Sequence, residues 1–460
     1  MAGVTLSGQR TLKDLEGEWL GKLKTPSVEL QVIFRFTITA ADSIKAVLDS
    51  PDQGAFDIPC GEVTFQEDTV FIDIPVVQGS YRGGFSSDSL ISGTFTQMGR
   101  KNDLTIKKGV KPVVHNRPQE PKPPYPYREE EVTFINTVEN FSLTGTLTLP
   151  QGEGPFPAVV LISGSGQQDR NETVFMHKPF LVLADHLTRN GIAVLRYDDR
   201  GVGKSKGNAI KATSLSFADD AEAAVTYLME RPEINARKIG LAGHSEGGLI
   251  APIAASHNRN IAFIVSLAGP GVTGYDVILR QTEDIMRASG AAQAEIAETL
   301  ATNGQLFHML IDESDQRKFS KDAMEWYGKE LDKKGLTQEE RQQKMAAFAQ
   351  GLVSANNPWM RYFLATDPAQ FWSQVKCPVL ALNGEKDLQV SQEINLPAIR
   401  AAVRSGGNRK VKTVMLPGLN HLFQHSETGS PDEYIKIEET FSPGAMELIS
   451  SWIRKTMKIK

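Results

Sequence analysis

Ser245 lies in the segment "GHSEGG" (243–248), between an apolar run at 238–242 and a run at 249–255 that predicts a helix. A serine hydroxyl is a poor nucleophile near neutral pH unless a base accepts its proton and an acid orients that base. The pattern Gly-x-Ser-x-Gly at a strand-to-helix turn holds the serine on a strained backbone, and its glycines avoid clashes with neighbouring chain. We therefore predict that Ser245 is a nucleophile.

Two later loops offer the acid and the base. Asp387 follows the apolar run at 378–384, and His421 follows the run at 411–420. The carboxyl ends of parallel strands share one edge of a sheet, so the two side chains are expected to meet Ser245 there, in the chain order Ser, Asp, His. We predict these three residues as a catalytic triad.

Each partner has an alternative in its own loop. Glu385 lies close before Asp387, and His425 lies close after His421. An acid in a loop is more often only solvated, and a lone histidine is usually structural. Asp387 and His421 are preferred, and both alternatives stay open.

A tetrahedral intermediate also needs main-chain donors aimed at its oxyanion. The N–H of Glu246, which follows the nucleophile at the amino end of a predicted helix, is one predicted donor. The second is expected from the loop "SGSGQQDRN" (163–171), where Ser165 is preferred and Gly166 is the reserve. The alternative interpretation of this loop is a glycine-rich turn without a catalytic role.

The segment "YDDRGVGKS" (197–205) ends like a phosphate-binding loop, but Asp198 stands where that motif requires glycine. A carboxylate there would repel a phosphate, so we interpret the segment as a structural turn and expect Asp198 and Arg200 to form pairs inside the protein. The sequence contains no His-Glu-x-x-His motif, cysteine pair or calcium loop. We therefore predict neither a metal nor a cofactor.

The composition favours a protein that acts on small molecules. The 460 residues suit two or three domains, and the net charge of −5 gives no broad positive field for nucleic acid. No apolar stretch reaches the roughly 18 residues of a membrane span. Cys60 and Cys377 fall in different predicted domains, which excludes a disulfide framework. The first ten residues lack the apolar core of a signal peptide, yet the compartment stays open between bacterial cytoplasm and, if a signal was removed, periplasm or exterior.

The predicted elements fall into two parts joined by a linker. Short alternating runs from about Leu15 to Lys108 predict antiparallel strands, hence a small all-β barrel or sandwich domain over residues 1–115, with Trp19 in its core. Residues 116–131 contain five prolines and a charged run, which predicts an extended linker, either a plain spacer or a docking segment for a partner.

After the linker the pattern changes to α/β. Apolar strands alternate with amphipathic helices, which requires a mostly parallel sheet covered on both faces. Between about 272 and 372 this alternation gives way to a helical stretch. An insertion after the carboxyl end of a strand lies where such sheets bind their ligands, so we predict a helical cap over a pocket.

From about Glu131 onward the chain resembles the α/β-hydrolases, and more narrowly their bacterial esterase D-like branch. The resemblance rests on "SGSGQQDRNE", "LRYDDRGVGKS", "GHSEGG" and "LNGEKDLQV" before "PGLNH". It implies an α/β-hydrolase domain over 132–460 with a cap, attached to an amino-terminal β domain, and a carboxylesterase that acts on short acyl chains. It also implies Ser245, Asp387 and His421 as the triad. Ser163 stands where the commoner pattern has histidine.

Three functions compete at this stage. The leading hypothesis is a serine carboxylesterase that needs no cofactor. A serine peptidase or aminopeptidase would use the same triad, with Glu246 or acids of the cap holding a substrate ammonium. A carbohydrate-binding or other interaction protein with an inert hydrolase domain is the third. The β domain has no assigned role; glycan contact, homo-oligomer formation and support of the cap all fit its sequence.

Overall fold

A computed structural model describes residues 10–24, 29–40, 43–51, 55–97, 100–112 and 115–459. The first nine residues, which carry most of the segment examined for a signal peptide, lie outside these ranges. The chain divides into two compact units, one of residues 1–116 with 174–177 and the other of residues 117–173 with 178–460.

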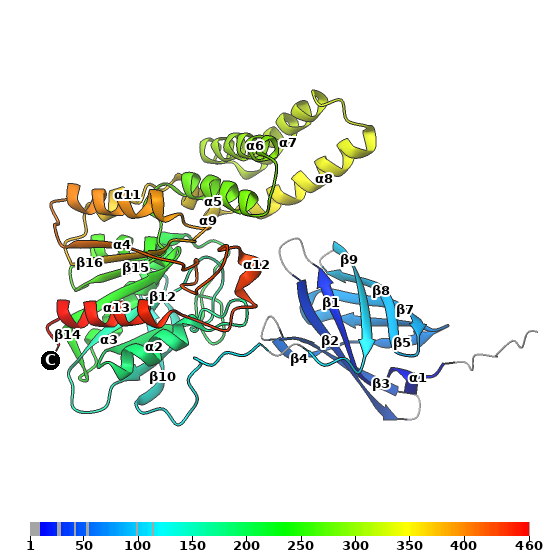
Figure 1. Ribbon diagram of the computed structural model, residues 1–460, viewed down its shortest axis with the longest axis horizontal. Coiled ribbons are helices and arrows are strands. Elements are labelled where there is room, and N and C mark those ends of the chain that lie inside the picture. Colours follow the sequence, from blue (N-terminus) through cyan, green and yellow to red (C-terminus); the bar gives the residue numbers. More distant parts are fainter. Residues whose placement is uncertain are drawn as a thin grey trace, which may run out of the picture. The chain divides into compact units, whose positions relative to one another are not determined.

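The first unit is built on one antiparallel sheet with the strand order β4-β3-β2-β1-β9-β8-β7-β6-β5 (Figure 1). Its elements are α1 (Leu12–Leu15), β1 (Gly17–Lys24), β2 (Glu29–Ala40), β3 (Ser43–Ser50), β4 (Ala55–Pro59), β5 (Val63–Gln66), β6 (Thr69–Ile74), η2 (Pro75–Val77), β7 (Gly79–Ser87), β8 (Leu90–Gln97) and β9 (Arg100–Lys108).

One apolar core lies on one side of this sheet. Alternate side chains face it, among them Phe34, Ile72, Tyr81 and Leu104, as period-two patterning requires. Trp19 is fully buried there and donates its Nε1–H to the carbonyl of Leu15 at 2.7 Å, which confirms its predicted place in the core. Within the described residues the strands form a single curled sheet, so the sandwich alternative is wrong and an open barrel describes this unit.

The second unit contains a mixed sheet with the order β10-β11-β13-β12-β14-β15-β16-β17. The pairs from β13 to β17 are parallel, whereas β10 and β11 pair antiparallel to each other and β11 to β13. The strands are β10 (Arg128–Asn136), β11 (Phe141–Leu149), β12 (Phe156–Ile162), β13 (Ala193–Tyr197), β14 (Ile234–His244), β15 (Ile264–Leu267), β16 (Val379–Gly384) and β17 (Val411–Leu416).

Helices cover both faces of this sheet, because its strands are apolar on both sides. One face packs against α3, α4, α10 and α11, and the other packs against α2 and α13. These helices are α2 (Pro179–Arg189), α3 (Ser214–Met229), α4 (Gly247–His257), α10 (Ala369–Trp372), α11 (Gln392–Ser405) and α13 (Pro443–Thr456); the short α12 (Pro431–Tyr434) precedes α13.

The predicted insertion is helical and lies between β15 and β16. It contains α5 (Gly274–Ala288), α6 (Gln293–Asp312), α7 (Gln316–Asp332), α8 (Gln338–Ala355) and α9 (Pro358–Ala365), followed by α10. Figure 1 shows α6, α7 and α8 together, away from the sheet. They have an apolar cluster of their own, which includes Phe307, Leu310, Phe319 and Leu352. None of the described helices combines the length and the apolarity that crossing a bilayer requires.

The predicted linker at 116–131 differs from the structure at its carboxyl end. Residues 128–131 belong to β10, whose side chains alternate between exposed and buried further along the strand. At the amino end, the Arg117 guanidinium donates to the carbonyls of Ile435 and Ile437, each at 2.8 Å. The start of this segment is therefore bound to the second unit rather than being a free spacer.

A chain shortened to begin at Arg117 is expected to fold, because the apolar clusters of the two units share no residue. Circular dichroism should show a cooperative thermal transition within about 2 °C of the transition of this unit in the full chain, a shift equivalent to roughly 1.5 kcal/mol for a domain of this size. Aggregation of the shortened chain, with the full chain soluble under the same conditions, would contradict the expectation.

Candidate active site

Ser245 lies in a tight turn between β14 and α4, with a left-handed backbone at φ 53°. A Cβ atom on Gly243 would lie 1.9 Å from the carbonyl oxygen of Gly247, and one on Gly247 would lie 2.2 Å from the carbonyl oxygen of Ile162. Both glycines are therefore required by contacts with main chain, which cannot move aside as a flexible side chain can. The Ser245 N–H donates to the carbonyl of Leu267 at 2.8 Å and ties the turn to β15.

Asp387 and His421 are hydrogen-bonded to each other. The Nδ1 atom of His421 lies 2.8 Å from Oδ2 of Asp387, and both side chains are buried. The other oxygen of Asp387 accepts the N–H groups of Gln389 and Val390 at 2.8 and 2.9 Å. The carboxylate is thus held by its own loop and can fix the orientation of the imidazole.

The two alternatives for the base and the acid have other partners. The Nδ1 atom of His425 lies 2.8 Å from Glu439, and 65% of the His425 side chain is exposed. Glu385 accepts the N–H of Gly418 at 2.8 Å. Of the four candidates, Asp387 and His421 are the pair that the structure joins.

Neighbouring residues bring the loop of His421 to the loop of Ser245. The Nε2 atom of His244, next to the serine, lies 3.0 Å from the main-chain oxygen of His421, and the two rings are 4.8 Å apart. On the other side, a Cβ atom on Gly164 would lie 3.1 Å from Cβ of Ser245. The loops that follow β12, β14 and β17 therefore meet at the carboxyl edge of the sheet.

Two of the predicted oxyanion donors, Glu246 and the reserve Gly166, line a small cavity. Glu246 directly precedes α4, where the first N–H groups of a helix have no partner within it. Gly166 lines the cavity with a left-handed backbone at φ 102°. The cavity has a volume of about 10 Å³, room for about one water molecule.

The side chain of Glu246 is buried and bound by protein donors. Its Oε1 atom accepts from Oγ of Ser214 at 2.6 Å and from Nε1 of Trp359 at 2.7 Å. Burial raises the pKa of Glu246, and the hydrogen bonds from Ser214, Trp359 and Ser165 offset part of that effect. This carboxylate is therefore engaged within the protein, unlike the free anion expected to hold a substrate ammonium.

Trp359 belongs to α9, so the inserted helices reach the elbow through its bond to Glu246. Sequence reasoning did not single out this tryptophan. The available signal was the segment "NNPW", in which Asn357 begins a helix followed by proline at its first position.

Ser163 and Asp199 attach the predicted oxyanion loop to the loop after β13. The Ser163 hydroxyl donates to Oδ1 of Asp199 at 2.9 Å, and the N–H of Gln168 donates to Oδ2 at 2.9 Å. Burial raises the pKa of Asp199 to about 8, although both hydrogen bonds lower it. The serine that departs from the commoner hydrolase pattern thus has a defined partner in this chain.

Asp198 and Arg200 pair inside the protein, each with a different residue. Asp198 receives Nε and Nη2 of Arg170 at 3.0 and 2.6 Å. Arg200 donates to Asp220 at 2.8 and 3.0 Å and to Glu139 at 2.6 Å. The segment at 197–205 joins several elements through these ion pairs, which fits its interpretation as a structural turn.

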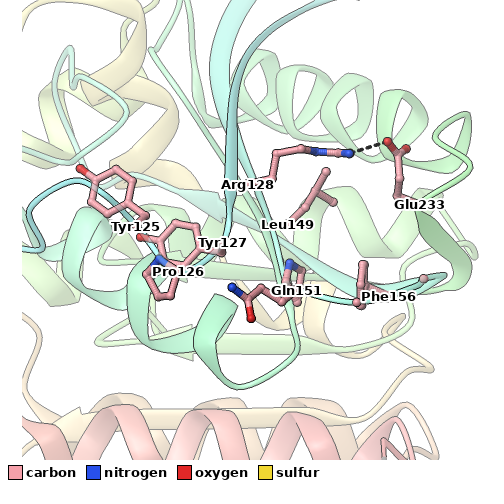
Figure 2. Close-up of a pocket in the computed structure, with 11 residues that line it drawn as sticks. Tyr125, Pro126, Tyr127, Arg128, Leu149, Gln151, Phe156 and Glu233 are labelled. Atoms are coloured by element: carbon pink, nitrogen blue, oxygen red, sulfur yellow. Dashed lines mark hydrogen bonds and ion pairs between the residues drawn. The ribbon is translucent and has the colours of Figure 1, made fainter.

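A second hollow of about 480 Å³ lies at the other end of the sheet, where β12 begins (Figure 2). Figure 2 shows Tyr125 and Tyr127 on one side and the ion pair between Arg128 and Glu233, 2.6 Å long, on another. Its lining residues include no serine, cysteine or histidine. It therefore offers no nucleophile of the kind found at the elbow.

Within the described residues no cluster of three or more histidine, cysteine, aspartate or glutamate side chains forms a metal site.

Comparison with known proteins agrees with this geometry. A family profile described as serine aminopeptidase, S33, matches residues 177–345. Esterase EstD of Thermotoga maritima is 28% identical over 317 residues, which cover 68% of this chain and 64% of that protein. Both similarities are to hydrolytic enzymes, which confirms the resemblance to the α/β-hydrolase superfamily drawn from the sequence. The chain spans less than two thirds of EstD.

Two further similarities are more distant or shorter. The thiohydrolase aneE of Aspergillus aculeatus is 30% identical over 182 residues, or 37% of this chain and 54% of that protein. The solved structure of the α/β-hydrolase GrgF from Penicillium sp. sh18 is 16% identical with a TM-score of 0.45, covering 72% of this chain and all of that one.

Replacing Gly247 with alanine is expected to lower the free energy of unfolding by about 3 kcal/mol or more, because the new methyl group meets main chain at 2.2 Å. Gly351 in α8 is the matched control, since a methyl group there meets no atom within 4 Å. Gly351→Ala should leave stability unchanged or raise it by about 0.5–1 kcal/mol, the helix preference of alanine over glycine. Urea unfolding measures both, and equal effects would contradict the predicted close approach.

Asp199 is expected to make the protein less stable as the pH rises from about 4 to 8. Its ordinary pKa is near 3.9, and the folded value is about 8. Between these values the folded protein keeps a proton that the unfolded chain has lost, so stability falls with rising pH. Asp199→Asn should show a smaller fall in Tm between pH 5 and pH 8. The exposed Asp312 is the control, and the Tm of Asp312→Asn should change with pH as the Tm of the wild type does. A fall in the Tm of Asp199→Asn as large as that of the wild type would contradict the raised pKa of Asp199.

Proposed function

We propose that this protein is a serine carboxylesterase that hydrolyses short-chain acyl esters through an acyl-enzyme. The observation that carries the proposal is the 2.8 Å hydrogen bond between Asp387 and His421, next to a serine in a left-handed turn. The similarity to an esterase over 68% of the chain supports the same conclusion.

In this mechanism Ser245 attacks the ester carbonyl while Nε2 of His421 accepts the hydroxyl proton. Asp387 holds the imidazole through Nδ1 and stabilises the imidazolium. The N–H groups of Glu246 and of Ser165, with Gly166 as the reserve, receive the negative charge on the carbonyl oxygen. His421 returns the proton to the leaving alcohol, and a water molecule, activated by the same imidazole, releases the acid from Ser245.

The preference for short acyl groups is supported by the contact of the inserted helices with the elbow. Trp359 of α9 is hydrogen-bonded to Glu246 and stacks on Phe363 at 5.3 Å, which brings apolar surface of the inserted helices to this point. In this proposal the insertion is a cap that limits the length of the acyl chain.

An aminopeptidase is the second candidate, because the family profile that matches residues 177–345 carries that description. Such an enzyme needs an anion to bind the substrate ammonium. Glu246 receives donors from Ser214 and Trp359, and burial raises its pKa. These contacts favour ester substrates over aminoacyl amides.

The test is a series of p-nitrophenyl esters of increasing chain length, assayed beside aminoacyl amides and fluorophosphonate labelling. We expect hydrolysis to be fastest for the shortest esters, and Ser245→Ala to lose both hydrolysis and labelling by at least about 10³-fold. Asp387→Asn should lose about 10³–10⁴-fold in kcat, because the imidazole then takes the wrong tautomer.

The rejected candidates supply matched controls in the same loops. Glu385→Gln and His425→Gln should retain activity within about threefold of the wild type, since each removes only an exposed or partly exposed contact. Faster turnover of amides than of esters would favour the aminopeptidase. Complete inactivity and no labelling of correctly folded protein would favour the inert binding protein.

A further inference from the structure

The imidazole of His244 is buried between two acceptors. Its Nδ1 atom lies 2.9 Å from Oε1 of Glu172, and its Nε2 atom lies 3.0 Å from the main-chain oxygen of His421. An acceptor at each nitrogen requires a proton on each nitrogen, which is the imidazolium form. Neither His244 nor Glu172 belongs to the triad or to the predicted oxyanion donors.

Glu172 connects the same ring to the oxyanion loop. Its Oε1 atom also accepts the N–H of Gly164 at 2.7 Å, and its main chain is left-handed at φ 53°. The side chain is buried, and its Oε2 atom has no hydrogen-bond partner among the described residues. A buried carboxylate in a strained backbone persists only where the surrounding structure determines it strongly. One continuous chain of hydrogen bonds therefore runs from Gly164 through Glu172 and His244 to His421.

We propose that His244 and Glu172 are positioning residues of the hydrolytic site, and that their charged pair holds the main chain of His421 and the oxyanion loop at the distances the reaction needs. The inference rests on the proposed function. Neither side chain needs to touch the substrate, because each acts through the main chain of a residue beside Ser245.

The contact with His244 joins the peptide of His421 to the elbow through its carbonyl. If this contact is lost, the loop that carries His421 can move away from Ser245, and misplacement by about 1 Å can lower a rate about 100-fold.

The groups that face His244 favour its charged form. They are Glu172 from the loop after β12, Asp387 from the loop after β16, and the ring of His421 from the loop after β17; the apolar ring of Phe423 lies 6.3 Å away. Burial lowers the pKa of His244, but the attraction of Glu172 and the bonds to Glu172 and the His421 carbonyl outweigh it, so the pKa is raised. The charged pair is lost as the pH rises through that raised pKa.

Two substitutions at the same position separate positioning from packing. The amide nitrogen of glutamine reaches the place of Nε2, so His244→Gln keeps the donor to the His421 carbonyl. The shorter asparagine places its amide near Nδ1, so His244→Asn keeps the contact with Glu172 and loses the other. We expect kcat at pH 7 to fall about tenfold to 100-fold in His244→Asn but to stay within about fivefold in His244→Gln.

The pH dependence of kcat distinguishes a positioning role from a purely structural one. The rate measured with Ser245→Ala is first subtracted, because it does not depend on the proposed nucleophile. In the wild type, the remaining kcat should fall at alkaline pH as the imidazolium of His244 loses a proton. That fall should disappear in His244→Gln, which does not titrate, and should move to lower pH in Glu172→Gln, which removes the negative partner. His425→Gln, at an exposed pair with Glu439, is the control and should keep the wild-type profile.

Fluorophosphonate labelling of the wild type and of Ser245→Ala separates this inference from the proposed function. If the wild type is not labelled, the proposed function fails. If it is labelled, and His244→Asn and His244→Gln have equal kcat and Tm within error and both keep the alkaline fall, the positioning role is wrong. If both variants unfold, Glu172→Gln decides: an unchanged profile overturns the proposal, and a shift to lower pH supports it.

Discussion

The site depends on how closely the chain approaches itself at the elbow. β14, α4 and the end of β12 come together at distances that leave no room for a side chain at Gly243 or Gly247. Gly248 is under the same restriction, because a Cβ atom there would lie 2.5 Å from Cα of Gly269. This packing forces the intervening Ser245 into a left-handed backbone, which costs roughly 1–3 kcal/mol. The serine and the loop after β12 are neighbours because the glycines allow these elements to touch.

The predicted oxyanion loop has no regular secondary structure, so side chains have to hold its main chain. Three acidic side chains do so: Glu172 accepts the N–H of Gly164, Asp199 that of Gln168, and Asp198 that of Arg170. The bonds to Glu172 and Asp198, which also face His244 and the Arg170 guanidinium, are charge-assisted and stronger than neutral ones, which suits a loop predicted to present donors in a fixed direction. Their carboxylates lie on the loop itself or directly after β13, and His244 links one of them to the loop after β17. The carboxyl edge of the sheet is thereby held by polar contacts above an apolar core.

What the sequence predicts well is local or follows from the rules of parallel sheets. Gly-x-Ser-x-Gly between an apolar run and a helix is a local pattern, and it is enough to indicate Ser245. Asp387 and His421 follow apolar strands, so a parallel sheet brings their loops to one edge without knowledge of any particular contact. The same rule could not choose between His421 and His425, because the choice depends on which ring the loop turns inward.

Contacts between loops and across the insertion could not be predicted in this way. Glu172 ends the quoted motif "SGSGQQDRNE", but nothing in the spacing indicates that it reaches His244 on another strand. The charged run at 128–131 resembled a solvated linker, whereas it begins an edge strand that tolerates charge on its exposed face. The partners of Asp198 and Arg200 could not be predicted either, because Arg170 and Asp220 belong to other parts of the chain.

The bond between Trp359 and Glu246 relates the inserted helices to the chemistry. A substrate large enough to displace α9 would have to break a 2.7 Å hydrogen bond to a carboxylate that is only 2% exposed. Leaving such a buried acceptor with one donor fewer costs about 1–3 kcal/mol, or roughly tenfold to 100-fold in binding. A small acyl group that fits beside the tryptophan avoids this loss. In the proposed esterase, the same hydrogen bond would keep Glu246 from acting as a free anion and would penalise acyl chains long enough to displace α9, so that both proposed preferences would follow from one contact.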